Sequence, residues 1–213
     1  MKKKRSKYTF IIDYFSKAQP DVASELHFAN PYELLVATML AAQCTDKRVN
    51  MVTPALFAAY PTVSDLAKAT EEQVLSYIKS VSYPNSKAKH LVQMAQMAVS
   101  DFGGEIPHTM DDLTQLPGVG RKTANVVLAF AFGQAAMPVD THVFRVSHRL
   151  GLVPDTAKTP EAVEKELIKN FPEAYISRAH HWLLLHGRYI CTARNPHCET
   201  CPLREICEFL TLT

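Results

Sequence analysis

Two short segments of the sequence contain residue types that could do covalent chemistry. The first, Leu116-Pro-Gly-Val-Gly-Arg-Lys-Thr-Ala124, places an amine, Lys122, directly after a glycine-rich turn. The second, Val139-Asp-Thr-His142, supplies a carboxylate, Asp140, eighteen residues after Lys122. An uncharged amine is a nucleophile that can form a Schiff base, and a carboxylate can stabilise developing positive charge and move protons. A helix N-terminus and partial burial would both disfavour an ammonium at Lys122.

The turn before Lys122 predicts a helix-hairpin-helix motif at about residues 110–130, with a first helix at 110–116 and the hairpin at 117–120. Gly118 and Gly120 flank Val119, and glycine lets the backbone adopt positive φ and approach a ligand closely. The unpaired N–H groups of the helix that follows favour a phosphate. Such a hairpin binds nucleic-acid backbone without reading sequence. An amine and a carboxylate beside it indicate chemistry on the sugar. The alternative is an ordinary turn with a solvated surface lysine.

Four of the five cysteines form a C-x6-C-x2-C-x5-C array, made of Cys191, Cys198, Cys201 and Cys207. Two disulfides are one interpretation, although reducing compartments disfavour them. A four-thiolate zinc site is the second, although such sites usually contain two C-x2-C pairs. A 4Fe–4S cluster is the third, and it tolerates unequal spacing. In either metal site, ligation would replace hydrophobic burial in this short segment.

The elements that must position these residues are helical. The chain has 213 residues, 47% of them apolar and only 7 of them glycine, and no segment shows sustained strand-like alternation. Helix-start signals precede apolar stretches at Asn30, Thr70 and Thr159. Apolar residues at three- and four-residue intervals predict further helices at 46–60, 86–102, 162–171 and 174–190. We therefore expect an all-α protein.

Charge and hydropathy limit the possible partners. The formal net charge is +2, but five basic residues lie within the first seven, and without them 18 basic residues face 21 acidic ones. Nucleic-acid binding must then depend on a local patch and oriented amides, with the stretch Lys2-Lys-Lys-Arg5 adding non-specific affinity. No apolar run reaches the roughly 18 residues of a membrane span. Asp13 interrupts the first apolar stretch, so we expect no signal peptide.

Residues 116–124 and 139–142, together with the cysteine array, resemble the endonuclease III family of DNA glycosylases, and the resemblance covers about residues 8–207. It implies two helical domains with a DNA-binding cleft between them. One domain is 26–133, which carries the hairpin, and the other combines 1–25 with 134–213 and carries a structural 4Fe–4S cluster at 191–207. The family also implies a monomer, and the reduced thiols favour a cytoplasmic, nucleoid-associated location.

The activity that the resemblance implies is that of a bifunctional glycosylase and AP lyase of base excision repair. Its partner would be double-stranded DNA containing damaged pyrimidines or abasic sites. Lys122 would expel an oxidised pyrimidine through a Schiff base and then cleave 3′ to the abasic site by β-elimination, with Asp140 as the second catalytic residue. A base inside a duplex is out of reach, so the nucleotide must first be flipped out of the stack.

The resemblance also indicates which residues contact DNA. Gln43 matches the residue that fills the vacated space, and Tyr83, followed by Pro84, stands where the family has a wedge leucine. An aromatic wedge can stack on a base. Arg194 is the only arginine between the first two cysteines of the array. The remaining expected contacts are Lys87, Gly118, Val119, Gly120, Arg121, Thr123 and His142.

Three other functions compete with this interpretation. An adenine-mismatch glycosylase would carry a glutamate where this chain has Ala37, and usually lacks the hairpin lysine. A thymine-mismatch glycosylase has a closer pattern. A non-catalytic DNA-binding module with a structural metal centre is the alternative from a different class, and the pair of Lys122 and Asp140 argues against it.

Overall fold

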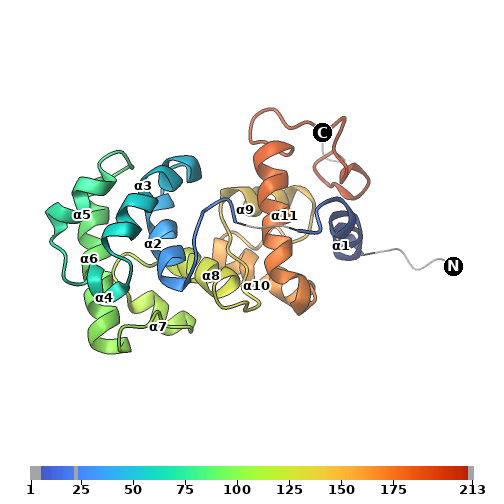
Figure 1. Cartoon of the computed structure of the whole chain (residues 1–213). Helices are drawn as coiled ribbons and strands as arrows, with labels where there is room; N and C mark the ends of the chain where they lie inside the picture. The colour runs from blue at the N-terminus through green and yellow to red at the C-terminus, as the bar shows by residue number, and fades with distance from the viewer. Residues whose placement is uncertain (1–5, 22–23, 211–213) are drawn as a thin grey trace. The chain divides into compact units, whose positions relative to one another are not determined.

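The computed structural model describes residues 6–21 and 24–210, and the regular secondary structure of these residues is entirely helical (Figure 1). The all-α prediction is therefore confirmed. The chain divides into two compact units, one formed by Ser24–Gly133 and the other by the segments on either side of it. The basic stretch Lys2-Lys-Lys-Arg5 lies outside the described residues. Across the described ranges, no helix is both long and apolar enough to cross a membrane.

The unit formed by Ser24–Gly133, called the hairpin unit below, is built around one buried helix. Its helices are α2 (Pro31–Ala41), α3 (Asp46–Ala59), α4 (Val63–Leu66), α5 (Glu71–Ile78), α6 (Pro84–Phe102), α7 (Met110–Gln115) and α8 (Arg121–Phe130). Eight of the eleven residues of α2 are buried, which is typical of a helix that is surrounded on all sides. Accordingly, α2 packs against α3, α6 and α8.

The predicted helix starts are present. Asn30 accepts a hydrogen bond from the backbone N–H of Glu33 at the start of α2. Thr70 and Gln73 form a reciprocal capping box at the start of α5, and Thr159 caps the helix that follows it. Each cap satisfies N–H groups that the first helical turn leaves unpaired. The predicted helix ends agree with the observed ones to within two residues.

The second unit, called the cluster unit below, joins the first helix of the chain to the last. It contains α1 (Lys7–Ala18), α9 (Thr141–Arg149), α10 (Pro160–Asn170) and α11 (Ile176–Tyr189), with 3₁₀ turns at Glu173–Tyr175 and Arg204–Ile206. Helices α9 and α11 lie side by side (Figure 1). The fully buried Trp182 of α11 stacks on Phe15 of α1 with ring centroids 5.7 Å apart. Its indole N–H donates to the carbonyl of Gln19 at 3.1 Å. These contacts place α1 in the cluster unit.

Candidate active site and metal centre

The glycine turn is a tight connection between α7 and α8. Gly118 has a φ of +78°, and a Cβ added there would lie 2.9 Å from Cβ of His90 and 3.0 Å from Cε of Met39. Only glycine fits such a position without strain or displacement of its neighbours. Val119 is buried, and its N–H donates to the carbonyl of Leu116 at 3.0 Å. The turn is therefore anchored on α2 and α6, the helices that carry Met39 and His90.

The first turn of α8 is open to a ligand. Gly120 is its N-cap residue and supplies no side-chain hydrogen bond to the helix. Gly120, Arg121 and Lys122 are exposed, and Thr123 is half-buried. Backbone N–H groups that no side chain caps favour an anion such as a phosphate. The partial burial expected for Lys122 is wrong for the free protein, because the buried face of α8 begins only at Ala124.

Asp140 is held by the helix that it starts. It is the N-cap residue of α9, and its Oδ1 accepts hydrogen bonds from the N–H groups of His142 at 2.9 Å and Val143 at 2.8 Å. Its other oxygen, Oδ2, accepts no hydrogen bond from the described residues. One carboxylate oxygen thus fixes the group, and the second is left for a ligand. Lys122 belongs to the hairpin unit and Asp140 to the cluster unit.

His142 occupies a packing position. It is half-buried, its Nδ1 lies 3.2 Å from Nη2 of Arg145, and its Cβ lies 2.9 Å from where a Cβ on Gly187 of α11 would be. The close approach of α9 to α11 explains why a glycine stands at position 187. The structure therefore gives His142 a role in packing, and its contact with DNA stays a prediction.

Gln43 and Tyr83 stand at the tips of two loops of the hairpin unit. Both are exposed, Tyr83 by 65%. Both have left-handed backbone, with φ of 55° at Gln43 and 54° at Tyr83. The Ser82 hydroxyl donates to the backbone carbonyl of Gln43 at 2.7 Å, which ties the two loops together.

Lys87 differs from the sequence-based expectation of a DNA contact. Its side chain is directed inward, the residue is only 8% exposed, and its Nζ donates to the carbonyls of Leu40 and Ala42 at 2.7 Å each. Burial lowers the pKa of Lys87, and the nearby Cys44 opposes this change. The ammonium compensates the partial negative charge at the C-terminus of α2. Lys87 therefore supports the Gln43 loop from inside and does not offer its amine to DNA.

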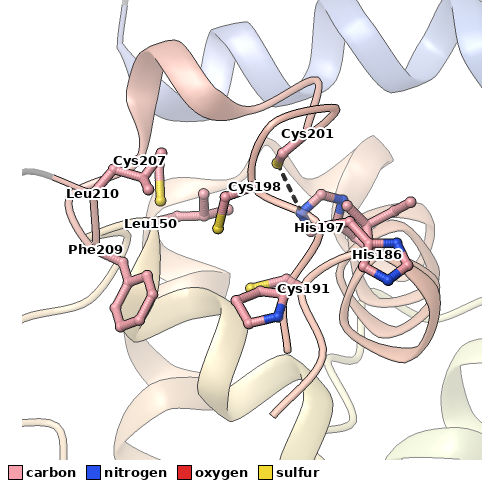
Figure 2. Close-up of a pocket in the computed structure, with 11 residues that line it drawn as sticks. Leu150, His186, Cys191, His197, Cys198, Cys201, Cys207, Phe209 and Leu210 are labelled. Carbon is pink, nitrogen blue, oxygen red and sulfur yellow. Dashed lines mark hydrogen bonds between the residues drawn. The ribbon is translucent and has the colours of Figure 1, made fainter. Parts of the chain in front are cut away.

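The four cysteines of the array line one cavity in the cluster unit (Figure 2). All four are free thiols, which excludes the two-disulfide interpretation. Among the described residues, no three His, Cys, Asp or Glu side chains converge closely enough to hold one metal ion. Burial raises the pKa of the Cys201 thiol, and the other three cysteines act in the same direction. A positively charged iron centre would compensate the charge of four adjacent thiolates, so the donor set fits a multi-iron cluster.

Two side chains that contact the cysteine sulfurs were not predicted from the sequence. Arg149 donates to Sγ of Cys191 at 3.4 Å and to the carbonyl of Thr192 at 2.7 Å. Nε2 of His186 lies 3.6 Å from Sγ of Cys201 (Figure 2). Burial lowers the pKa of His186 to about 4, so its imidazole is neutral at pH 7. The only feature of the sequence that could have indicated these contacts is the position of Arg149, one helical turn after Arg145.

The loop between Cys191 and Cys198 is tied to α9. Arg145 donates from Nε to the carbonyl of Cys191 at 3.1 Å and from Nη2 to that of Gly187 at 2.8 Å. Arg194 is exposed in this loop, so its predicted DNA contact is sterically open. The helix that begins at Asp140 thus also carries the arginine that holds the cysteine loop.

Comparisons with known proteins agree with this geometry. Residues 36–173 match the family described as HhH-GPD superfamily base excision DNA repair protein. Residues 191–207 match the iron-sulfur binding domain of endonuclease III. The chain is 47% identical to endonuclease III of Rickettsia felis over 93% of this chain and 92% of that protein. It is 40% identical to endonuclease III of Escherichia coli strain K12 over 96% of both.

Solved structures give the same result. A trapped endonuclease III–DNA covalent intermediate has a TM-score of 0.89 and 41% identity, covering 97% of this chain and 98% of that chain. A thermostable thymine-DNA glycosylase has a TM-score of 0.81 and 25% identity, covering 97% of this chain and 95% of that chain. The chain is therefore a base excision DNA repair protein of the HhH-GPD superfamily. Within that superfamily it belongs to the endonuclease III family, the DNA glycosylases and AP lyases that carry an iron–sulfur centre.

Proposed function

We propose that this chain removes oxidised pyrimidines from double-stranded DNA, with Lys122 as the nucleophile. The observation that carries the proposal is the position of Lys122 in the first turn of α8, directly after an anchored hairpin, where no side chain caps the N–H groups of the helix. A phosphate bound there brings a neighbouring deoxyribose near the amine.

The chemistry of this amine proceeds in two stages. The lone pair of uncharged Lys122 Nζ attacks C1′ of the flipped nucleotide, and the bond from C1′ to the base breaks, so that the base leaves with the electron pair and then gains a proton. Loss of the amine proton and opening of the sugar give a Schiff base. This iminium acidifies the C2′ hydrogens, and removal of one of them expels the 3′ phosphate by β-elimination.

Asp140 is proposed as the carboxylate that serves this reaction. Its Oδ1 is held by the two N–H groups of α9, while Oδ2 accepts no hydrogen bond within residues 6–21 and 24–210. A fixed negative charge stabilises the positive charge that develops on the sugar as the base departs. Oδ2 can also accept and return the protons of the attack and elimination steps.

We also propose the groups that hold the DNA and the metal centre. Gln43 and Tyr83 enter the base stack, and the exposed glycines of the hairpin and Arg194 contact phosphate. The four thiolates hold a 4Fe–4S cluster, which supplies cross-links for residues 191–207. Reducing conditions that preserve such thiols support a cytoplasmic location on the nucleoid. The monomeric state stays a prediction.

Borohydride trapping tests the nucleophile. Lys122→Gln should abolish the covalent product on a duplex containing thymine glycol and leave binding of that duplex within a few-fold of wild type. The matched control is Lys169→Gln, which removes the same charge from an exposed position on α10. Undiminished trapping in Lys122→Gln would remove the lysine from its role. Absence of trapping in the wild type would favour the non-catalytic DNA-binding module.

Two substitutions separate the charge of Asp140 from its capping role. Asparagine caps a helix as well as aspartate does, so Asp140→Asn should preserve stability and slow single-turnover base release by at least about a hundredfold. Asp140→Ala should lose both the rate and about 1 kcal/mol of stability. A near-normal rate in Asp140→Asn would refute the assignment.

Faster processing of a T·G mismatch than of thymine glycol would favour the thymine-mismatch alternative.

A further inference from the structure

The two exposed loop tips share an unusual backbone conformation. Among the described residues, Gln43 and Tyr83 are the only non-glycine residues with positive φ. Left-handed backbone is unfavourable for residues with a Cβ, and it persists only where the surrounding contacts over-determine it. Pro84 stands at the first position of α6, where its ring fixes φ directly after Tyr83. The backbone at both tips is therefore held by surrounding contacts, and both residues are exposed.

Those contacts form one link between the loops. The Ser82 hydroxyl donates to the carbonyl of Gln43 at 2.7 Å. The backbone N–H of Lys87 donates to the carbonyl of Tyr83 at 3.1 Å, and its Nζ donates to the carbonyl of Ala42 at 2.7 Å. Lys87 thus bonds through its backbone to Tyr83 and through its side chain to Ala42, the residue before Gln43.

The link is costly to break from inside. Lys87 is only 8% exposed, and a buried amine is tolerated only while its N–H donors are paired. Its second acceptor, the carbonyl of Leu40 at 2.7 Å, belongs to the last turns of α2. Moving the Gln43 loop alone would break the hydrogen bond from this amine to the carbonyl of Ala42. The two tips are therefore expected to move together or not at all.

The same two helices also hold the hairpin. Gly118 packs against Met39 of α2 and His90 of α6. Helix α2 leads into the Gln43 loop, and α6 begins directly after Tyr83. A phosphate on the hairpin is thus held at a set distance from both tips, because all of these groups belong to the hairpin unit.

We propose that Gln43 and Tyr83 form one preorganised two-part probe of the DNA stack, and that Ser82 and Lys87 are the positioning residues that hold its halves in register. This inference rests on the proposed DNA contacts of the two tips. A flipped nucleotide leaves a gap in one strand and an orphaned base in the other. A rigid probe fills the gap and stacks on the orphaned base in a single step, so the entropy of ordering two loops is not lost on binding.

A double-mutant cycle on the holoenzyme tests the link. The probe is a duplex with a tetrahydrofuran abasic mimic opposite 2-aminopurine, and both the dissociation constant and the 2-aminopurine fluorescence are measured. Gln43→Ala and Tyr83→Ala should each weaken binding about tenfold, and Tyr83→Ala should raise the fluorescence because the orphaned base loses its stacking partner. The double variant should lose clearly less than the product of the two single effects, because tips that act together are not independent.

The positioning residues supply the second measurement. Lys87→Met keeps the stem of the side chain and removes both hydrogen bonds, and Ser82→Ala removes the third without touching the buried amine. Each should raise the 2-aminopurine fluorescence toward that of Tyr83→Ala, and in the Lys87→Met background the tip effects should become multiplicative. Lys89→Met, an exposed lysine two residues further along α6, is the control and should match wild type.

The outcomes separate the link between the two loop tips from the DNA contacts of the tips. If the single tip variants weaken binding but their effects multiply in the wild type, the link is overturned and the DNA contacts stand. Wild-type fluorescence in both Lys87→Met and Ser82→Ala would overturn the positioning roles in the same way. If neither tip variant changes binding or fluorescence, the proposed DNA contacts themselves fall.

Discussion

Replacing Gly118 by alanine should destabilise the hairpin unit far more than the same change at Gly120. At Gly118 the backbone φ is +78°, and the new Cβ would lie 2.9 Å from Cβ of His90 and 3.0 Å from Cε of Met39. Left-handed backbone costs a residue with a Cβ about 1–2 kcal/mol. Forcing a methyl group into a packed site costs about 1–3 kcal/mol more. The Met39 methyl can yield, but Cβ of His90 is fixed by α6.

The substitution also has a small favourable effect. The unfolded chain has less conformational entropy with alanine than with glycine at this position, which offsets about 0.4–1 kcal/mol of the destabilisation. We therefore expect Gly118→Ala to lower the free energy of unfolding by about 2–4 kcal/mol. Gly120 lies in the same turn, but its φ is −94° and a Cβ there meets nothing within 4 Å. Gly120→Ala is thus a matched control, which should cost at most about 1 kcal/mol because alanine is a poorer N-cap residue than glycine.

Urea denaturation of the holoenzyme measures this difference. Far-UV circular dichroism follows the helices of both units, and the fluorescence of Trp182, the single tryptophan, follows the cluster unit, which the substitution does not touch. A Gly118→Ala variant as stable as Gly120→Ala would refute the close packing of the hairpin on α2 and α6. It would also remove the physical reason for expecting a fixed distance between the hairpin and the two loop tips.

Three further predictions concern the cluster unit. Burial lowers the pKa of His181 to about 4 from 6.5, so the unfolded chain binds more protons between those pH values. Stability should therefore fall by about 3 kcal/mol as the pH falls through that window, and urea titrations monitored by Trp182 fluorescence should show a shallower fall for His181→Gln. Burial lowers the pKa of His186 in the same way, so part of the pH dependence of stability should remain in His181→Gln. Cys201→Ser should reduce the visible absorbance of the cluster and expose residues 191–207 to limited proteolysis. Equal protease resistance in apo and holo protein would contradict the idea that cluster ligation stabilises this segment. Thr159→Ala should cost about 1 kcal/mol and Thr159→Ser almost nothing, since only alanine loses the cap of α10; equal midpoints of urea unfolding for the two variants would contradict this.

Much of the site could be predicted because its signals are local. The glycine turn, the first turn of α8 and the capping position of Asp140 depend on residues within a few positions of one another. Backbone geometry and hydrogen bonding over one helical turn determine such features. The cysteine array was equally readable, since four thiols within seventeen residues admit few chemical uses. Periodicity also predicted the helices, because each has an apolar face to bury.

Lys87 shows where local reasoning fails. A lysine beside a loop that resembles a DNA-contacting wedge is reasonably read as a phosphate ligand. Its acceptors, however, are carbonyls of Leu40 and Ala42, which are 47 and 45 residues away in the sequence. Only the packing of α6 on α2 places those carbonyls beneath the amine. The sulfur contacts of Arg149 and His186 were missed for the same reason, since they depend on how α9, α11 and the cysteine loop meet.

The amino-acid sequence by itself thus determined the helices, their caps, the hairpin with its amine, and the iron–sulfur ligands, because these follow from interactions within a turn or a short segment. The tertiary structure alone decided which side chains face inward, as at Lys87, and which side chains reach the thiols, as at Arg149 and His186. Those features depend on the burial of apolar surface between distant segments, for which no short stretch of sequence carries the information.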